Sequence, residues 1–369
     1  MRHFAMPSPT LKILSALAAA AAILVQSSLH ADESVDPRIA AVAAILPPSP
    51  GACVMAIDRG EIVFQHGFGL ADVAGNVPCT PQTNFRLASV TKQFTAACVL
   101  LLHERKQLAL DDPLPKFFPG FPAYGATITV RHLLAHTSGL PEYEGLIPAG
   151  TTLPLDDLDV LQMLMETEQA NFPAGEKWEY SNSGYVLLGL IVEQVAKKPF
   201  HDFLHEELLA PCAMTNSVLY VQGLNEVPQR AYGHELVDGK WIRADQSLTS
   251  ATRGDGGLYC SLDDYRKWLA ALAAHRLLEP EGRRLMFTPQ FTTIRDAAGY
   301  GSGWFIDRYR DEDRVYHNGE TRGFSHTAQT FPQRNAAIVL LLNSVAPQPM
   351  TQLGEKLADA LLFDAASSR

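Results

Sequence analysis

Short runs of β-like residues lie near both ends of the chain. Near the start, residues 53–57 and 62–67 flank Asp58-Arg59-Gly60, which predicts a hairpin, and residues 36–46 before it have helical periodicity. Similar runs recur late in the chain, at residues 302–307, 315–317, 327–331 and 336–342, before helical periodicity returns at residues 350–363. Strands from both ends of the chain therefore predict one antiparallel sheet, covered by N- and C-terminal helices.

The middle of the chain has a different pattern, because helical periodicity alternates there with loops rich in proline and glycine. The helical segments are expected at residues 91–105, 130–135, 158–166, 183–196 and 201–208. The fold class predicted is α+β, with a mainly helical lobe inserted into the sheet. The sheet lobe comprises about residues 35–88 and 255–364, and the helical lobe about residues 89–254. Ligand sites in such layouts tend to lie in the cleft between the lobes.

The first residues carry the pattern of a secretory signal peptide. Arg2 and Lys12 precede an alanine-rich apolar run at residues 13–25, and small residues follow up to Ala31. The run is shorter than the roughly 20 residues that a membrane-spanning helix needs. We therefore expect residues 1–31 to be removed and the domain at residues 32–364 to be secreted to the periplasm or the cell exterior, without a stable membrane span.

Charge and composition restrict the partners. The chain has 30 basic and 40 acidic residues, for a net charge of −10, which argues against nucleic acid and anionic membrane surfaces. Five cysteines occur without the spacing of a zinc site, and His132 and His136 lack the glutamate of a zinc-protease motif. We expect no cofactor and no metal, and a small molecule or a peptide as substrate. The sequence leaves the oligomeric state open.

Ser89 is the one serine that is followed three residues later by a lysine, in Ser89-Val90-Thr91-Lys92. The motif lies where a loop passes into a long predicted helix, and a spacing of three places both side chains on one helix face. The lysine amine can then accept the serine proton, and the free backbone N–H of Ser89 can stabilise an oxyanion. The alternative is an ordinary helix-capping serine with a solvated lysine one turn later.

Tyr180-Ser181-Asn182 follows a loop and precedes another predicted helix. A phenol there can share the serine proton with the lysine and pass it to a leaving group, while Asn182 can bond the lysine and the substrate. The alternative is an aromatic residue beside a helix cap, and Tyr-x-Asn also occurs at residues 316–318.

His317-Asn318-Gly319 ends a predicted strand. Gly319 would let a substrate lie along the strand, and the side chain of His317 would face the cleft as a donor. The N–H of Glu320 would complete the oxyanion hole. A histidine at a strand end is, however, more often structural than catalytic.

These three motifs, in this order, resemble those of the class C β-lactamase and D-alanyl-D-alanine carboxypeptidase superfamily, which also contains esterases and amidases. Further similar stretches lie at residues 85–88, 133–140, 173–176 and 256–258. The resemblance implies that Ser89 is the nucleophile, that Lys92 and Tyr180 transfer protons, and that Asn182 positions the substrate.

His317 departs from that pattern, because β-lactam- and peptide-cleaving members usually carry a lysine there. A lysine supplies a fixed cation for a substrate carboxylate, whereas histidine is mostly neutral at pH 7. We therefore expect an exported serine hydrolase that forms an acyl-enzyme on Ser89 and acts on D-amino-acid peptides, esters or amides. The alternatives are an esterase of small or lipid substrates, a true β-lactamase, or a slowly acylating penicillin-binding sensor.

Overall fold

The computed structural model describes residues 36–292 and 299–363. The chain divides into two units, Met1–Pro37 and Arg38–Arg369, and the described helices and strands all belong to the second. The predicted signal peptide lies outside the described residues. Within the described ranges, no helix combines the length and the apolar character that crossing a bilayer requires.

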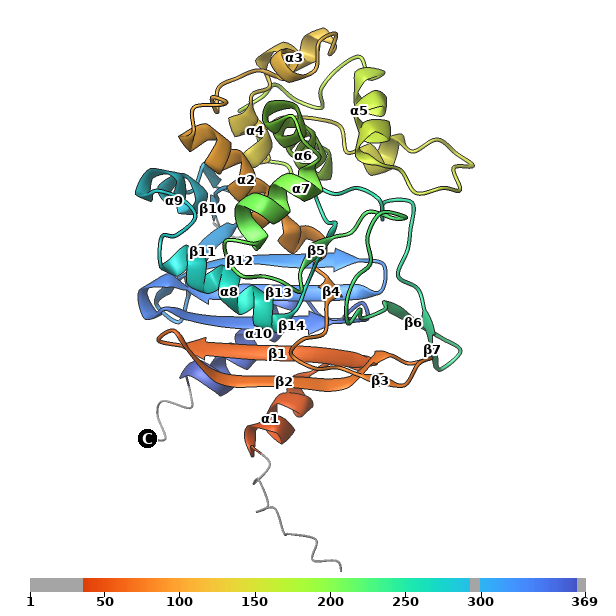
Figure 1. The fold of residues 1–369 in the computed structure, drawn as a ribbon, viewed down its shortest axis with the longest axis vertical. Helices are drawn as coiled ribbons and strands as arrows, with labels where there is room; N and C mark the ends of the chain where they lie inside the picture. The colour runs from red at the N-terminus through yellow and green to blue at the C-terminus, as the bar shows by residue number, and fades with distance from the viewer. Residues whose placement is uncertain (1–35, 293–298, 364–369) are drawn as a thin grey trace, which may run out of the picture. The chain divides into compact units, whose positions relative to one another are not determined.

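A sheet of nine strands, all paired antiparallel, forms the centre of the second unit (Figure 1). Its order is β3-β2-β1-β14-β13-β12-β11-β10-β9. The strands are β1 (Gly51–Asp58), β2 (Glu61–Asp72), β3 (Val77–Pro78), β9 (Phe291–Thr292), β10 (Gly299–Tyr300), β11 (Phe305–Tyr309), β12 (Glu312–Thr321), β13 (Phe324–Phe331) and β14 (Ala336–Leu342). The strand nearest the C-terminus, β14, thus lies between β1 and β13.

The sheet is covered on both faces, so its central strands are apolar at successive positions. In β1, Val54 contributes to one apolar cluster and Met55 to the other, as expected for side chains that alternate between faces. The first face packs against α1 (Arg38–Ile45), α10 (Met350–Ala358) and the π-helical turn η6 (Asp359–Phe363), and α10 is seen behind the sheet in Figure 1.

The other face meets α8 (Leu262–Ala273) and the helical segments in the middle of the chain. At their centre lies α2 (Lys92–Glu104), which follows the 3₁₀ turn η1 (Ala88–Thr91) and is buried at every position from Lys92 to Leu100. The remaining helices are α3 (Leu114–Phe117), α4 (Val130–Leu134), α5 (Asp157–Met165), α6 (Asn182–Ala196), α7 (Phe200–Leu204) and α9 (Pro280–Phe287). The short turns are η2 (Ala123–Thr127), η3 (Tyr143–Leu146), η4 (His205–Leu209) and η5 (Pro332–Arg334).

Two small sheets complete the unit. β4 (Phe85–Arg86), β8 (Leu258–Cys260) and β5 (Val218–Leu219) form one, and the hairpin of β6 (His234–Val237) and β7 (Lys240–Arg243) forms the other. Because β4 leads directly into η1, its pairing with β8 fixes the segment that carries Ser89.

The predicted α+β class, with an antiparallel sheet and flanking helices, is confirmed. One predicted strand is displaced. Residues 302–304 are not part of β11, because Gly303 adopts a φ of 81° and lies against the backbone of Lys92. Helices α8 and α9 were not predicted.

Candidate active site

Ser89 lies in η1, between β4 and α2. The preceding residue, Ala88, has a φ of 48°, a left-handed conformation that is uncommon for a residue with a Cβ atom. Residues 83–88 and 90–100 are buried, whereas Ser89 is half-buried. The chain therefore turns sharply at Ala88 and presents the hydroxyl of Ser89 at the surface of a buried segment.

Lys92 is fully buried, and its amine contacts three oxygen atoms. Its Nζ lies 3.0 Å from Ser89 Oγ, 2.8 Å from Asn182 Oδ1 and 3.0 Å from the carbonyl oxygen of Asp255. Three acceptors match the three N–H bonds of an ammonium group. Within residues 36–292 and 299–363, no carboxylate forms an ion pair with Lys92.

Tyr180 and Asn182 flank the residue that caps α6. Ser181 Oγ accepts a hydrogen bond from the N–H of Gly184 at 3.1 Å, and the N–H of Ser181 donates to His136 Nδ1 at 3.1 Å. The ring centroid of Tyr180 lies 4.9 Å from Lys92 Nζ. Its hydroxyl is buried and has no hydrogen-bond partner among the described residues. A buried hydroxyl without a partner normally costs stability.

His317 lies on β12 and is 1% exposed. Burial, together with the charge of Lys92, lowers its pKa to about 3, so the imidazole is neutral at pH 7. Its Nδ1 lies 2.6 Å from the carbonyl oxygen of Asn318 and therefore carries the proton, which leaves Nε2 to accept from Tyr300 Oη at 3.2 Å. Both nitrogens are thus engaged, and a direct hydrogen bond from His317 to a substrate would require one of these contacts to break.

Gly319 has a different structural reason from the one predicted. A Cβ atom at this position would lie 2.3 Å from the carbonyl oxygen of Leu87, so glycine allows β12 to pack against the segment that precedes the nucleophile. The position without a side chain thus faces the backbone of Leu87 and not a space that a substrate could occupy.

A cavity of about 50 Å³ lies beside Ser89 and brings together residues from distant parts of the chain. It is lined by Arg86, Ala88, Ser89, Tyr143, Glu144, Asn182, Thr249, Thr252, Asp255, Gly256, Glu320 and Thr321. Of the seven predicted site residues, Ser89, Asn182 and Glu320 thus line it. Lys92 contacts three of the lining residues, whereas Tyr180, His317 and Gly319 are not among those that form the wall.

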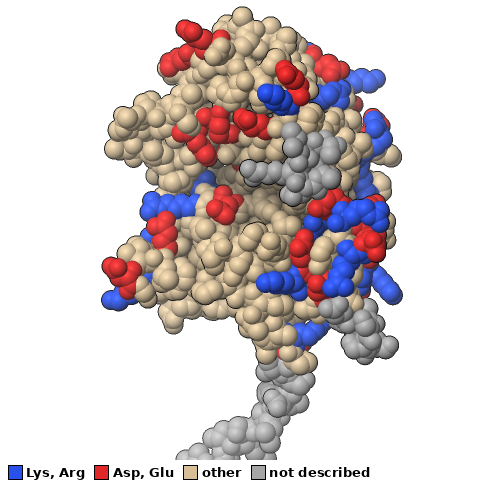
Figure 2. Space-filling view, turned by 180° about the vertical axis from the view of Figure 1, so that it is seen from behind, with Lys and Arg blue, Asp and Glu red and all other residues tan. Residues whose placement is uncertain are grey.

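Acidic groups outnumber basic ones around this cavity. Glu144, Asp255 and Glu320 line it, and Arg86 is the one basic residue among the lining residues. The guanidinium of Arg86 is 3% exposed and donates to the carbonyl oxygen of Ser250 at 3.0 Å. Figure 2 shows Asp and Glu side chains at the border of a hollow in the face that it displays.

Glu142 and Asp255 are site residues that were not predicted from the sequence. The carboxylate of Glu142 accepts from the backbone N–H groups of Asn182 (2.8 Å) and Ser183 (3.1 Å), and burial raises its pKa to about 7. It thereby holds the start of α6. Asp255 belongs to the glycine-rich stretch at residues 254–257, and this unusual local composition was the available signal. In the described part of the chain, no group of three or more His, Cys, Asp or Glu residues could hold a metal ion.

The fold and the serine-lysine arrangement define this protein as a serine hydrolase of the α+β type. Residues 43–362 match the Beta-lactamase family, and the chain belongs to that family.

Relatives cover most of the chain. Penicillin-binding protein 4* of Bacillus subtilis is 29% identical over 325 residues, which cover 84% of this chain and 72% of the relative. Protein flp of Staphylococcus aureus is 30% identical over 304 residues, which cover 80% of this chain but 59% of the relative. The crystal structure of D-amino acid amidase from Ochrobactrum anthropi, complexed with L-phenylalanine amide, has a TM-score of 0.77 at 26% identity and covers 90% of this chain and 100% of its own.

Proposed function

We propose that this hydrolase forms an acyl-enzyme on Ser89 and cleaves amides and peptides of D-amino acids. The observation that carries the proposal is the distance of 3.0 Å between Lys92 Nζ and Ser89 Oγ, with the aromatic ring of Tyr180 beside the same amine. A nucleophile and a base within hydrogen-bond reach are the requirement for covalent catalysis.

In the proposed mechanism, Lys92 reacts as the neutral amine, whose lone pair accepts the proton of Ser89 Oγ, and the oxygen attacks the carbonyl carbon of the substrate. The backbone N–H groups of Ser89 and Glu320 donate to the oxyanion that forms. Tyr180 gives its proton to the leaving amine and regains one from Lys92, so the proton of Ser89 ends on the product. Water then attacks the ester on Ser89 and releases the acid, and the same groups move its proton.

The charge around the cavity supports a substrate with an amino group near the scissile bond. Glu144, Asp255 and Glu320 line the wall, and their charges favour a nearby ammonium group. The neutral imidazole of His317 offers no fixed cation for the carboxylate of a penicillin. The similarity to a D-amino acid amidase, which covers 90% of this chain, also supports this substrate class.

The test uses two assays. A fluorophosphonate probe, followed by peptide mass spectrometry, should place the adduct on Ser89, and labelling that persists in Ser89→Ala would refute the nucleophile. Hydrolysis of D-phenylalanine amide should then exceed that of the L-isomer, of a cephalosporin and of a short-chain ester. If the preparation cleaves the ester alone, the protein is an esterase and the proposed amidase activity is wrong. A stable adduct without turnover would indicate a sensor.

We also propose export, on the pattern of residues 1–31 alone. The intact mass of the protein recovered from the periplasm or medium should lack this segment. Retention of residues 1–31 would contradict the proposal.

A further inference from the structure

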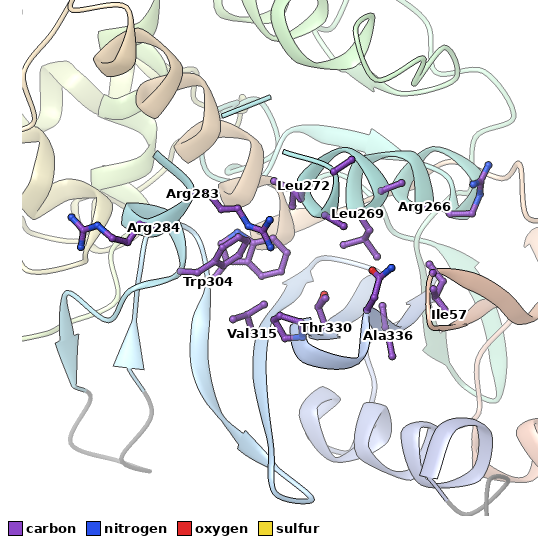
Figure 3. A pocket seen from close by; sticks show the side chains of 18 of the residues that line it. Ile57, Arg266, Leu269, Leu272, Arg283, Arg284, Trp304, Val315, Thr330 and Ala336 are labelled. Carbon is purple, nitrogen blue, oxygen red and sulfur yellow. The ribbon is translucent and has the colours of Figure 1, made fainter. Parts of the chain in front are cut away.

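A second, larger cavity, of about 640 Å³, lies apart from the one beside Ser89 and shares no lining residue with it. It is enclosed by α8, α9 and the face of the sheet formed by β1, β12, β13 and β14 (Figure 3). Its volume falls within the roughly 300–1,000 Å³ of sites that hold small organic ligands.

The walls of this cavity are mostly apolar. Leu269 and Leu272 of α8 form one side, Val315 and Ala336 of the sheet form the other, and the indole of Trp304 closes one end. A surface of this kind favours an aliphatic or aromatic ligand body, because burying it removes apolar area from water.

Two arginines that line the cavity, Arg266 of α8 and Arg283 of α9, form no ion pair with a carboxylate in the described part of the chain. Arg283 of α9 lines the cavity and is half-buried (Figure 3). In the part of the chain that the structure describes, no carboxylate pairs with it. Its neighbours are the imidazole of His275, with 2.6 Å between Arg283 Nη1 and His275 Nε2, and the ring of Phe287, with Arg283 Cζ 5.8 Å from the ring centroid.

The absence of a counter-charge is informative because charges removed from water are normally paired. Burial lowers the pKa of Arg283, and no acidic neighbour opposes this effect. The adjacent Arg284, which also lines the cavity, shows the ordinary arrangement, since its guanidinium lies 2.6 Å from the carboxylate of Glu281 (Figure 3). A ligand carboxylate would supply the missing charge and two hydrogen bonds to the planar guanidinium.

We propose that this cavity binds an anionic amphiphile, a single-chain carboxylate, with the chain between α8 and the sheet and the carboxylate on Arg283. The proposal does not depend on the function assigned to Ser89, because the two cavities are separate.

The test is a fluorescence titration with dansylaminoundecanoic acid on the Ser89→Ala protein, so that turnover cannot interfere. Dodecanoate should displace the probe, and 1-dodecanol should displace it at least tenfold less well. Arg283→Gln should weaken binding of the acid at least tenfold, the loss expected for one charge-assisted contact. Arg284→Gln is the matched control and should bind as the parent does.

A second variant tests the location of the site. Ala273 is exposed at the end of α8 and lines the cavity, so Ala273→Trp should fill it without disturbing the core and abolish binding. Unchanged binding in Ala273→Trp, or equal displacement by dodecanol, would overturn the proposal. So would binding to vesicles containing phosphatidylglycerol but not to the free acid, since the ligand would then be a lipid surface. Thermal melts confirm that each variant is folded.

Discussion

The hydroxyl of Tyr180 is a group whose catalytic role can be distinguished by experiment from a structural role. This hydroxyl is buried and forms no hydrogen bond with a described residue, and the ring that carries it lies beside Lys92. Removing the hydroxyl therefore breaks no contact that stabilises the fold. A structural tyrosine would behave in the opposite way, since loss of its hydroxyl would lower stability and leave chemistry intact.

We therefore expect Tyr180→Phe not to lower the free energy of unfolding, and to raise it by as much as about 1–3 kcal/mol, because the variant removes a buried hydroxyl that has no partner. The same variant should lower kcat by about 10²- to 10⁴-fold, the range for loss of a proton-transfer group. Urea unfolding and steady-state kinetics on one preparation measure both. A variant that unfolds more easily but keeps its kcat would assign Tyr180 a structural role.

His317 predicts a dependence of stability on pH. Its pKa is about 3 in the folded state and about 6.5 in the unfolded chain, so the unfolded state binds more protons between these values. Stability should therefore fall as the pH drops from 6.5 towards 3, by at most about 1.4 kcal/mol per pH unit for this one group. His326, with a pKa of about 4, acts in the same direction, and Glu142, with a pKa of about 7, opposes both.

His317→Gln isolates the first contribution. The difference in unfolding free energy between parent and variant, measured with urea at pH 7 and pH 4.5, should shrink at the lower pH. If the two proteins keep a constant difference, His317 is not held neutral in the folded state.

At the scale of the element, formation of α6 positions two residues of the site, because the residue that caps this helix lies between Tyr180 and Asn182. Ser181 Oγ accepts a hydrogen bond from the N–H of Gly184, and the carboxylate of Glu142 accepts from the N–H groups of the two residues that follow Ser181. The first turn of this helix therefore fixes the position of the amide that contacts Lys92.

Ser181→Ala should cost about 1 kcal/mol of stability, as loss of a helix cap does, and should lower kcat as well. Ser261→Ala is the matched control, since Ser261 caps α8 through the N–H of Asp264 at 3.3 Å and lines neither cavity. Chemical denaturation and kinetics of the two variants should show similar stability losses and a kinetic defect in the first alone. Equal kinetics would mean that the cap of α6 does not position the site.

Helices and strands that show a regular pattern of apolar residues could be predicted from the sequence. Those whose ends depend on contacts with distant parts of the chain could not. The continuous apolar run of β1 and the helical spacing of α6 follow directly from the residue pattern. Gly303, by contrast, breaks the apparent strand at residues 302–307 because it must pass close to Lys92, which is distant in sequence. Helix α8 had a readable signal in Ser261 and the apolar spacing that follows it, and this signal was missed.

The same distinction applies to the site. A spacing of three predicts that Ser89 and Lys92 lie on one face, and their side chains are 3.0 Å apart, although their catalytic roles stay a prediction. The carbonyl of Asp255 and the carboxylate of Glu142 reach the site through tertiary packing over long separations in sequence. The tautomer of His317 depends on Asn318 and Tyr300, which no pattern in the sequence connects to it.

At the scale of the whole molecule, all five cysteines are buried as free thiols within the described chain. Cys53 and Cys79 lie within hydrogen-bond reach of each other, and this contact raises the pKa of Cys53. Burial likewise raises the pKa of Cys98. Thiols that are both protonated and inaccessible react slowly.

Titration with a chromogenic disulfide reagent should therefore detect fewer than one thiol in the native protein and five after denaturation. Protein treated beforehand with a reductant is the control for adventitious oxidation. Three thiols in denaturant, restored to five by the reductant, would show a disulfide, for which Cys53 and Cys79, within hydrogen-bond reach of each other, are the candidate pair.

The position of β14 has a consequence for the newly made protein. This strand is completed at Leu342, yet it separates β1 from β13 in the middle of the sheet. A ribosome must therefore release the chain as far as Leu342 before the two halves of the sheet can join. Until then, one edge of β13 is unpaired, and a truncation that removes β14 splits the sheet instead of shortening it at one edge.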